Sequence, residues 1–158
     1  MRSKQELDIV DVVIPAYNEE RSIGLVLNDI PTSLVRHVIV CNNNSTDRTK
    51  MVAQDKGAIV VDAPKKGYGS ACLKGLAYLD NLEDKSDIVV FLDGDYSDYP
   101  QEMSKLLFPI RNEGKDLVIG SRALGNLERG SMQMQQIFGN WLATTLIRLF
   151  YKYEFTEY

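Results

Sequence analysis

The chain alternates between short apolar runs and segments in which apolar residues recur with helical spacing. The apolar runs are rich in β-branched residues and are bounded by polar turns, which is typical of strands buried on both faces of a parallel sheet. They predict strands over residues 9–14, 37–41, 58–63, 87–93 and 116–122. We expect the first strand to stop at Pro15.

The intervening segments predict helices. Residues 16–30 place Ile23, Val26, Leu27 and Ile30 on one face, with Asn18 as the expected cap and Pro31 after the end. The other expected helices start near Asp47, run from the glycine-rich loop 65–70 to about Leu82, and follow Pro100 with Asp98 as the cap.

Strands that alternate with helices predict an α/β fold, with a mostly parallel sheet covered on both faces. Ligands of such sheets bind beyond the carboxyl ends of the strands. Polar segments gather at these ends, at 17–19, 42–47, 65–70, 93–98 and 121–122. We therefore expect one domain over residues 1–158 with a ligand site at this edge.

The last segment has a different pattern. Residues 133–153 predict one long amphipathic helix that either packs on the core or rests at a membrane surface, with Arg148 and Lys152 facing lipid headgroups.

The composition of the chain limits the classes of partner that it can be expected to bind. The 158 residues carry 18 basic and 22 acidic side chains, a net charge of -4, which gives no electrostatic footprint for nucleic acid. The chain shows no signal peptide and no apolar stretch of the roughly 18 residues that a membrane span needs. We expect a cytoplasmic protein, peripheral to the membrane if the last helix lies on it; a homo-oligomer is left open.

Asp93-Gly94-Asp95 is the strongest local signal, because it follows an apolar strand directly. Residues two apart point to the same side of a strand, so the two carboxylates can converge on Mg²⁺ or Mn²⁺. The alternative is a solvated acidic turn before the next helix. A cation would supply the opposite charge that makes this cluster tolerable.

Several enzyme classes find no support. The glycine-rich loop KKGYGSA lacks the P-loop pattern, and no G-x-G-x-x-G follows the first strand. His37, the one histidine, lies away from the strand ends, and Cys41 and Cys72 match no metal spacing. What remains is a metal-bound nucleoside diphosphate at the strand ends, which fits group transfer from an activated donor.

Five motifs, in order, resemble those of the glycosyltransferases of family 2, which have the Rossmann-like GT-A nucleotide-sugar fold. The motifs are VVIPAYNEE (12–20), CNNNSTDRT (41–49), KKGYGSA (65–71), LDGDYSDYP (92–100) and VIGSR (118–122). Within the family the chain is similar to dolichyl-phosphate mannose or glucose synthases and to bacterial polyprenyl-phosphate glycosyltransferases, which would imply a role in cell-envelope polysaccharide synthesis.

The resemblance implies roles for individual residues. The nucleotide-sugar-binding set is Pro15, Ala16, Tyr17, Glu19, Asn42, Asn43, Asp93, Gly94 and Asp95, with Tyr17 near the base. The implied metal ligands are Asp93, Asp95 and Ser97, the last where relatives often have glutamine. The implied catalytic residues are Asp95 and Arg122, the arginine near the donor or acceptor phosphates.

Asn42 and Asn43 stand where the family usually has two aspartates. A carboxylate only accepts hydrogen bonds, which suits the N–H donors of guanine, whereas an amide both accepts and donates. Uracil offers an N–H beside carbonyl oxygens, so our hypothesis favours a UDP-sugar over a GDP-sugar.

The implied reaction is metal-dependent, inverting transfer of a hexose to an acceptor. A lipid phosphate acceptor at the membrane surface needs no general base because its oxygen is already anionic, and no base is evident in the sequence. Relatives continue past this length, so we expect a C-terminally incomplete domain that keeps the donor half, residues 9–122. The alternatives are a catalytically impaired nucleotide-binding module and a nucleotidyltransferase.

Overall fold

The computed structural model describes residues 8–120. Four parallel strands form one sheet in the order β3-β2-β1-β4. They are β1 (Val10–Ala16), β2 (His37–Asn42), β3 (Ile59–Asp62) and β4 (Ile88–Phe91). These are four of the five strands that the sequence predicted, and the parallel α/β arrangement confirms the predicted fold class.

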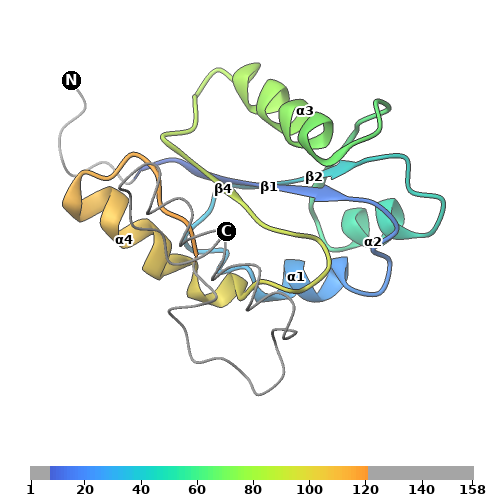
Figure 1. Cartoon of the computed structure of the whole chain (residues 1–158), viewed down its shortest axis with the longest axis horizontal. Coiled ribbons are helices and arrows are strands. Elements are labelled where there is room, and N and C mark those ends of the chain that lie inside the picture. Colours follow the sequence, from blue (N-terminus) through green and yellow to red (C-terminus); the bar gives the residue numbers. More distant parts are fainter. Residues whose placement is uncertain (1–7, 121–158) are drawn as a thin grey trace, which may run out of the picture. The chain divides into compact units, whose positions relative to one another are not determined.

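Helices cover both faces of the sheet. Helix α3 (Tyr68–Asp80) packs on one face, and α1 (Ile23–Asp29) and α2 (Thr49–Asp55) lie on the other (Figure 1). Every residue of β1 is buried as a result, because this central strand has neighbours on both faces and both edges. The strand therefore holds the site at its carboxyl end on a rigid support.

The core beneath α3 shows how closely this helix approaches the sheet. Val13 and Cys41 from the strands meet Ala71 and Leu79 from the helix in one buried cluster. A Cβ atom built on Gly75 would lie 2.5 Å from Cγ1 of Val13 and 2.8 Å from Sγ of Cys41. The helix lies this close to β1 and β2 because residue 75 has no side chain.

Two predicted boundaries were wrong. Strand β1 continues through Pro15 to Ala16, because the missing N–H of Pro15 lies on the side of β4, whose pairing with β1 ends at Phe91. Asn18 does not cap α1: its backbone has a φ of 57° and its Oδ1 accepts from the N–H of Thr46. Helix α1 therefore begins later than predicted, at Ile23.

The chain divides into two compact units, Met1–Lys105 and Leu106–Tyr158. A short 3-10 helix, η1 (Pro100–Glu102), leads into α4 (Met103–Glu113), which runs across the boundary. None of the helices between residues 8 and 120 is long and apolar enough to cross a membrane.

The predicted strand over 116–122 is not found in its described part, residues 116–120. Leu117 and Ile119 are 76% and 77% exposed there. A strand needs a neighbour that satisfies its backbone hydrogen bonds, and no strand of the described residues pairs with this segment. The predicted helix over 133–153 lies outside the described residues, so one domain over residues 1–158 stays a prediction.

Candidate functional site

A cavity of about 580 Å³ opens at the carboxyl ends of the strands in the first unit. Three parts of the chain that are distant in sequence line it: the end of β1, the loop into α3, and the segment that follows β4. The lining residues are Pro15, Ala16, Tyr17, Glu19, Asn43, Lys66, Gly67, Tyr68, Ala71, Asp93, Gly94 and Asp95. The ligand site was predicted at this edge of the sheet.

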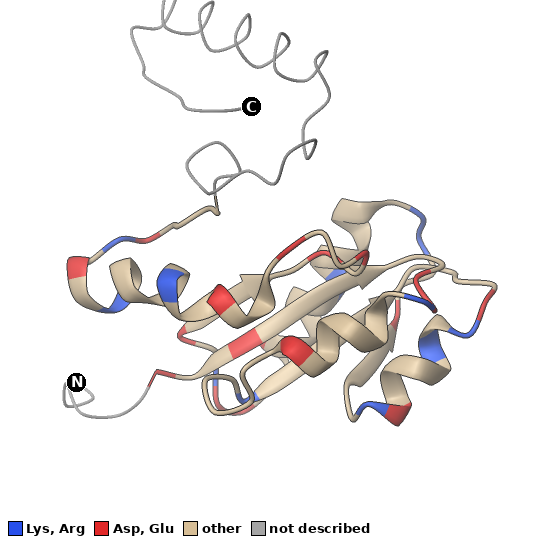
Figure 2. Ribbon diagram, turned by 90° about the horizontal axis from the view of Figure 1, so that it is seen from below, with Lys and Arg blue, Asp and Glu red and all other residues tan. Residues whose placement is uncertain are grey.

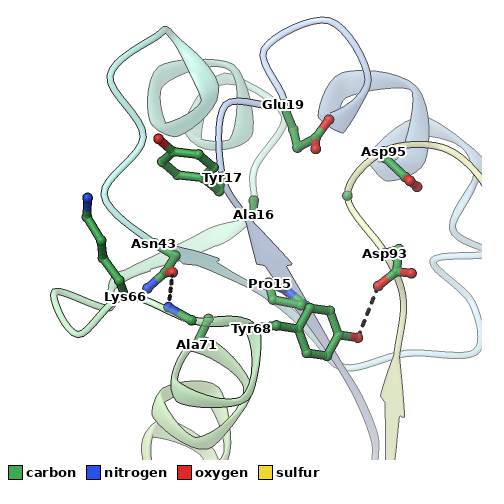
Figure 3. A pocket seen from close by; sticks show the side chains of 12 residues that line it. Pro15, Ala16, Tyr17, Glu19, Asn43, Lys66, Tyr68, Ala71, Asp93 and Asp95 are labelled. Carbon is green, nitrogen blue, oxygen red and sulfur yellow. Dashed lines mark hydrogen bonds between the residues drawn. The ribbon is translucent and has the colours of Figure 1, made fainter.

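The two sides of the cavity differ in chemistry. Tyr17, Asn43 and Lys66 lie on one side, and Asp93 and Asp95 lie on the other (Figure 3). Elsewhere Lys and Arg positions are interspersed with Asp and Glu positions along the described elements (Figure 2). The concentration of carboxylates on one wall is therefore a local feature of the cavity.

The loop that carries Tyr17 and Glu19 is tied to the loop after β2. The N–H of Glu19 donates to Oγ1 of Thr49 at 2.7 Å, and the N–H of Glu20 donates to a carboxylate oxygen of Asp47 at 3.1 Å. Burial raises the pKa of Asp47, but hydrogen bonds from Thr49 and Glu20 outweigh it and hold the pKa below its usual value. The ionised Asp47 therefore holds the loop after β1 against the loop after β2, next to the cavity.

Asn43 fixes the loop that leads from β3 into α3. Its Nδ2 donates to the carbonyl oxygens of Ala63 and Lys65 at 2.7 and 2.8 Å, and its Oδ1 accepts from the N–H of Gly67 at 2.8 Å. Gly67 has a φ of 122°, a conformation that favours glycine. The segment from Ala63 to Gly67 is thus held in one shape by a single buried amide.

The acidic wall is ordered by its own hydrogen bonds. The hydroxyl of Tyr68 donates to Oδ1 of Asp93 at 3.0 Å, and the N–H of Ser97 donates to Oδ1 of Asp95 at 2.9 Å. Burial, the hydrogen bond to Asp93 and the charge of Asp93 raise the pKa of Tyr68, so its hydroxyl stays protonated and donates.

Asp98 was predicted as a helix cap, and that prediction was wrong. Its Oδ2 accepts the N–H of Asp93 at 2.9 Å, while Tyr99 precedes η1 without a capping side chain. The carboxylate of Asp98 therefore closes the turn of the acidic segment.

The donor set fits a hard divalent cation. Asp93 and Asp95 line one cavity, and each uses one carboxylate oxygen in a hydrogen bond that the chain supplies to it. Between residues 8 and 120 no group of three or more His, Cys, Asp or Glu side chains could hold a metal by itself. A cation here would take two protein carboxylates and complete its shell with ligand or water oxygens, as Mg²⁺ commonly does.

Some predicted residues lie away from the cavity wall. Asn42 donates through Nδ2 to Asp62 at 3.0 Å and accepts through Oδ1 from the N–H of Ser45 at 3.2 Å, and it does not line the cavity. Ser97 is exposed and is not a lining residue, and its contact with Asp95 is made by its backbone. Arg122 lies outside the described residues.

Four lining residues had no assigned role in the sequence: Lys66, Gly67, Tyr68 and Ala71. The motif KKGYGSA was recognised, but its spacing does not show which side chains turn inward. The signal available was the position of this loop at the carboxyl end of β3, a strand of the parallel sheet that pairs with β2.

Known proteins are similar to this chain in sequence. The family model for glycosyl transferase family 2 matches residues 11–157. The low-salt glycan biosynthesis hexosyltransferase Agl6 of Haloferax volcanii is 32% identical over 147 residues, which is 90% of this chain and 34% of that protein. The UDP-N-acetylglucosamine–dolichyl-phosphate N-acetylglucosaminyltransferase of Methanococcus voltae is 27% identical over 150 residues, 84% of this chain and 59% of that protein.

A solved structure is similar to this chain as well. Glucosyl-3-phosphoglycerate synthase from Mycobacterium tuberculosis, in complex with Mn²⁺, UDP and glucosyl-3-phosphoglycerate, superposes with a TM-score of 0.60 and 31% identity. The match covers 70% of this chain and 42% of that one. The chain thus spans less than two thirds of the length of each of these proteins, and it belongs to glycosyltransferase family 2.

Proposed function

We propose that this chain binds a nucleoside diphosphate sugar in the cavity and transfers the sugar, with inversion, to an acceptor. The proposal rests on one observation: three segments of the chain converge on one cavity. They are the end of β1, the loop into α3 that Asn43 holds in place, and the turn that carries Asp93 and Asp95. Two carboxylates on one wall suit a cation and a diphosphate, and an aromatic ring on the other suits a base.

Asp93 and Asp95 would hold Mg²⁺ or Mn²⁺ together with the diphosphate. When bound, the cation supplies positive charge that stabilises the departing nucleoside diphosphate. The Mn²⁺ and Mg²⁺ complexes of the mycobacterial synthase support this assignment. Ser97 stays a proposed third ligand, and its backbone N–H donates to Asp95.

UDP is the proposed nucleotide. The mycobacterial synthase was solved with UDP and with UDP-glucose, and Tyr17, 55% exposed, presents its ring at the side of the cavity away from Asp93. Stacking of the base on Tyr17 would leave the diphosphate to reach the acidic wall.

The proposed acceptor is a polyprenyl or dolichyl phosphate at the cytoplasmic face of a membrane. Its phosphate oxygen is already anionic near neutral pH and needs no general base, and the named substrate of the Methanococcus relative is dolichyl phosphate. Arg122 is proposed to bind phosphate near the reacting centre. Transfer from UDP-glucose to polyprenyl phosphate in detergent, compared with transfer to 3-phosphoglycerate, distinguishes a lipid acceptor from the acceptor of the mycobacterial synthase.

Calorimetry tests the donor site directly. The full chain should bind UDP more tightly with Mn²⁺ than with EDTA, and more tightly than it binds GDP. Asp95→Asn should weaken Mn²⁺-dependent UDP binding by roughly tenfold or more, about 1.4 kcal/mol, because a charged ligand becomes neutral. Asp55→Asn, at an exposed position on α2, is the matched control. Equal UDP affinity in wild type and Asp95→Asn would remove the metal role, and tighter GDP binding would overturn the choice of base.

A further inference from the structure

The hydroxyl of Tyr68 lies on the acidic wall and contacts Asp93, a proposed metal ligand. We propose that Tyr68 is a positioning residue: its hydroxyl holds Oδ1 of Asp93, so that Oδ2 is presented to the divalent cation. This inference rests on the proposed function, because it assigns Tyr68 a task in the same nucleotide and metal site.

The position of Asp93 is determined at two points. Its backbone N–H donates to Oδ2 of Asp98 at 2.9 Å, which fixes the main chain of the turn. The terminal torsion of an aspartate side chain is broad, so a fixed backbone does not by itself orient the carboxylate. The hydrogen bond from Tyr68 at 3.0 Å supplies the missing constraint.

The position of Tyr68 is determined in turn by the clamped loop. Tyr68 is the first residue of α3, and it follows Gly67, whose N–H donates to Asn43. The φ of 122° at Gly67 turns the chain so that the ring of Tyr68 crosses toward Asp93 (Figure 3). A path of fixed contacts therefore runs from the end of β2 through the loop to the acidic wall.

Packing does not account for a tyrosine at this position. The side chain is 61% exposed, so burial of the ring contributes little. What the tyrosine adds is a hydroxyl that donates a hydrogen bond to the Asp93 carboxylate. Hydrogen-bond partners of metal ligands orient those ligands, and their removal commonly weakens metal binding by roughly 10- to 100-fold.

Tyr68→Phe tests this role because it removes only the hydroxyl. UDP binding is measured by calorimetry on the full chain in Mn²⁺ and in EDTA, and Mn²⁺ binding in the presence of UDP is measured by electron paramagnetic resonance. We expect roughly tenfold weaker binding of Mn²⁺, with UDP affinity in EDTA and the melting temperature unchanged. A merely structural role would change the last two. Tyr99→Phe, which removes the hydroxyl of an exposed tyrosine outside the cavity lining, is the matched control.

A double-mutant cycle with Asp93→Asn connects the effect to the proposed partner. In the Asp93→Asn background, Tyr68→Phe should cause no further loss of Mn²⁺ affinity, since the oriented carboxylate is gone. Undiminished Mn²⁺ binding by Tyr68→Phe, or equal losses in both backgrounds, overturns the positioning role and leaves the proposed function intact. A wild-type chain that binds neither Mn²⁺ nor UDP overturns the proposed function and this inference with it.

Discussion

All three hydrogen bonds of the Asn43 side chain go to the backbone between Ala63 and Gly67. The amide of Asn42 is likewise used, by Asp62 and Ser45. The sequence hypothesis assigned both amides to nucleotide recognition, at positions where the family reads base and ribose. That role stays a prediction, but the side-chain atoms on which it depends already have partners within the chain. The proposed preference for UDP therefore does not depend on these two amides.

The Asn43 clamp can be tested by Asn43→Asp, which keeps the shape and removes both donors. The carboxylate would face the carbonyl oxygens of Ala63 and Lys65, so we expect the free energy of unfolding to fall by about 2 kcal/mol. Urea denaturation measures it. Asn81→Asp is the control, because it removes one hydrogen bond, to Ala77, at an exposed site. Equal small losses in the two variants would contradict the clamp.

The sequence alone could identify Asn43 as a candidate site residue, but it could not show which groups the side chain bonds to. They lie about twenty positions further along the chain, and only the parallel pairing of β2 with β3 brings them within reach. The same applies to Tyr68 and Asp93, which come from different elements and meet only once α3 packs on the sheet.

At the scale of elements, the apolar pattern of the sequence correctly predicted the four strands that pair in the sheet. The apolar runs of β1, β2, β3 and β4 are strands because neighbours pair with them on the sheet. The run at 116–120 is also apolar but has no strand partner among the described residues, so the pattern by itself was insufficient. The start of α1 could not be predicted from the local sequence. Asn18 accepts a hydrogen bond from Thr46 in the loop after β2, and no local pattern shows such a contact.

The approach of α3 to the sheet depends on Gly75. Gly75→Ala would place a methyl group against Val13 and Cys41, at distances that require the helix or the strands to shift. We expect a loss of about 1–3 kcal/mol in the free energy of unfolding, measured by urea denaturation. Gly69→Ala, in the same helix with nothing within 4 Å of the added carbon, should be neutral or slightly stabilising. A Gly75→Ala chain as stable as Gly69→Ala would show that α3 is not tightly packed.

At the scale of the whole molecule, the end of the sheet opposite the cavity is held by a buried carboxylate. Asp11, fully buried in β1, accepts from Nε of Arg36 at 3.1 Å, the N–H of His37 at 3.0 Å and the hydroxyl of Ser86 at 2.6 Å. It thereby joins β1 to the start of β2 and to the segment before β4. Burial raises the pKa of Asp11, but the hydrogen bonds from Arg36 and Ser86 outweigh it and hold the pKa below its usual value.

This depressed pKa makes stability depend on pH. The contribution of ionised Asp11 is complete above its unfolded pKa of about 3.9 and is lost as the pH falls through the lower folded value. Asp11→Asn should cost about 3 kcal/mol at pH 7, because Arg36 loses the carboxylate with which it pairs. In urea denaturation the gap between wild type and variant should narrow toward pH 3.

Asp80→Asn is the control for this effect. Its side chain is 85% exposed, so the variant should stay within about 0.5 kcal/mol of wild type at both pH values. A gap between wild type and Asp11→Asn that persists unchanged at pH 3 would assign the stabilisation to packing and not to charge.

Pro15 has a consequence for how the cavity arises. Alternate residues of β1 bond to alternate neighbours: Val13 accepts from Leu92 on the β4 side, and Ala16 accepts from Asn43 on the β2 side. The next hydrogen bond between β1 and β4 would need the backbone N–H of residue 15, which proline lacks. Pairing between β1 and β4 therefore stops there while β1 and β2 stay hydrogen-bonded through Ala16, and the segment that carries Asp93 and Asp95 follows shortly after the last paired residue of β4. A single absent amide hydrogen thus leaves this segment outside the sheet, where Asp93 and Asp95 line the cavity.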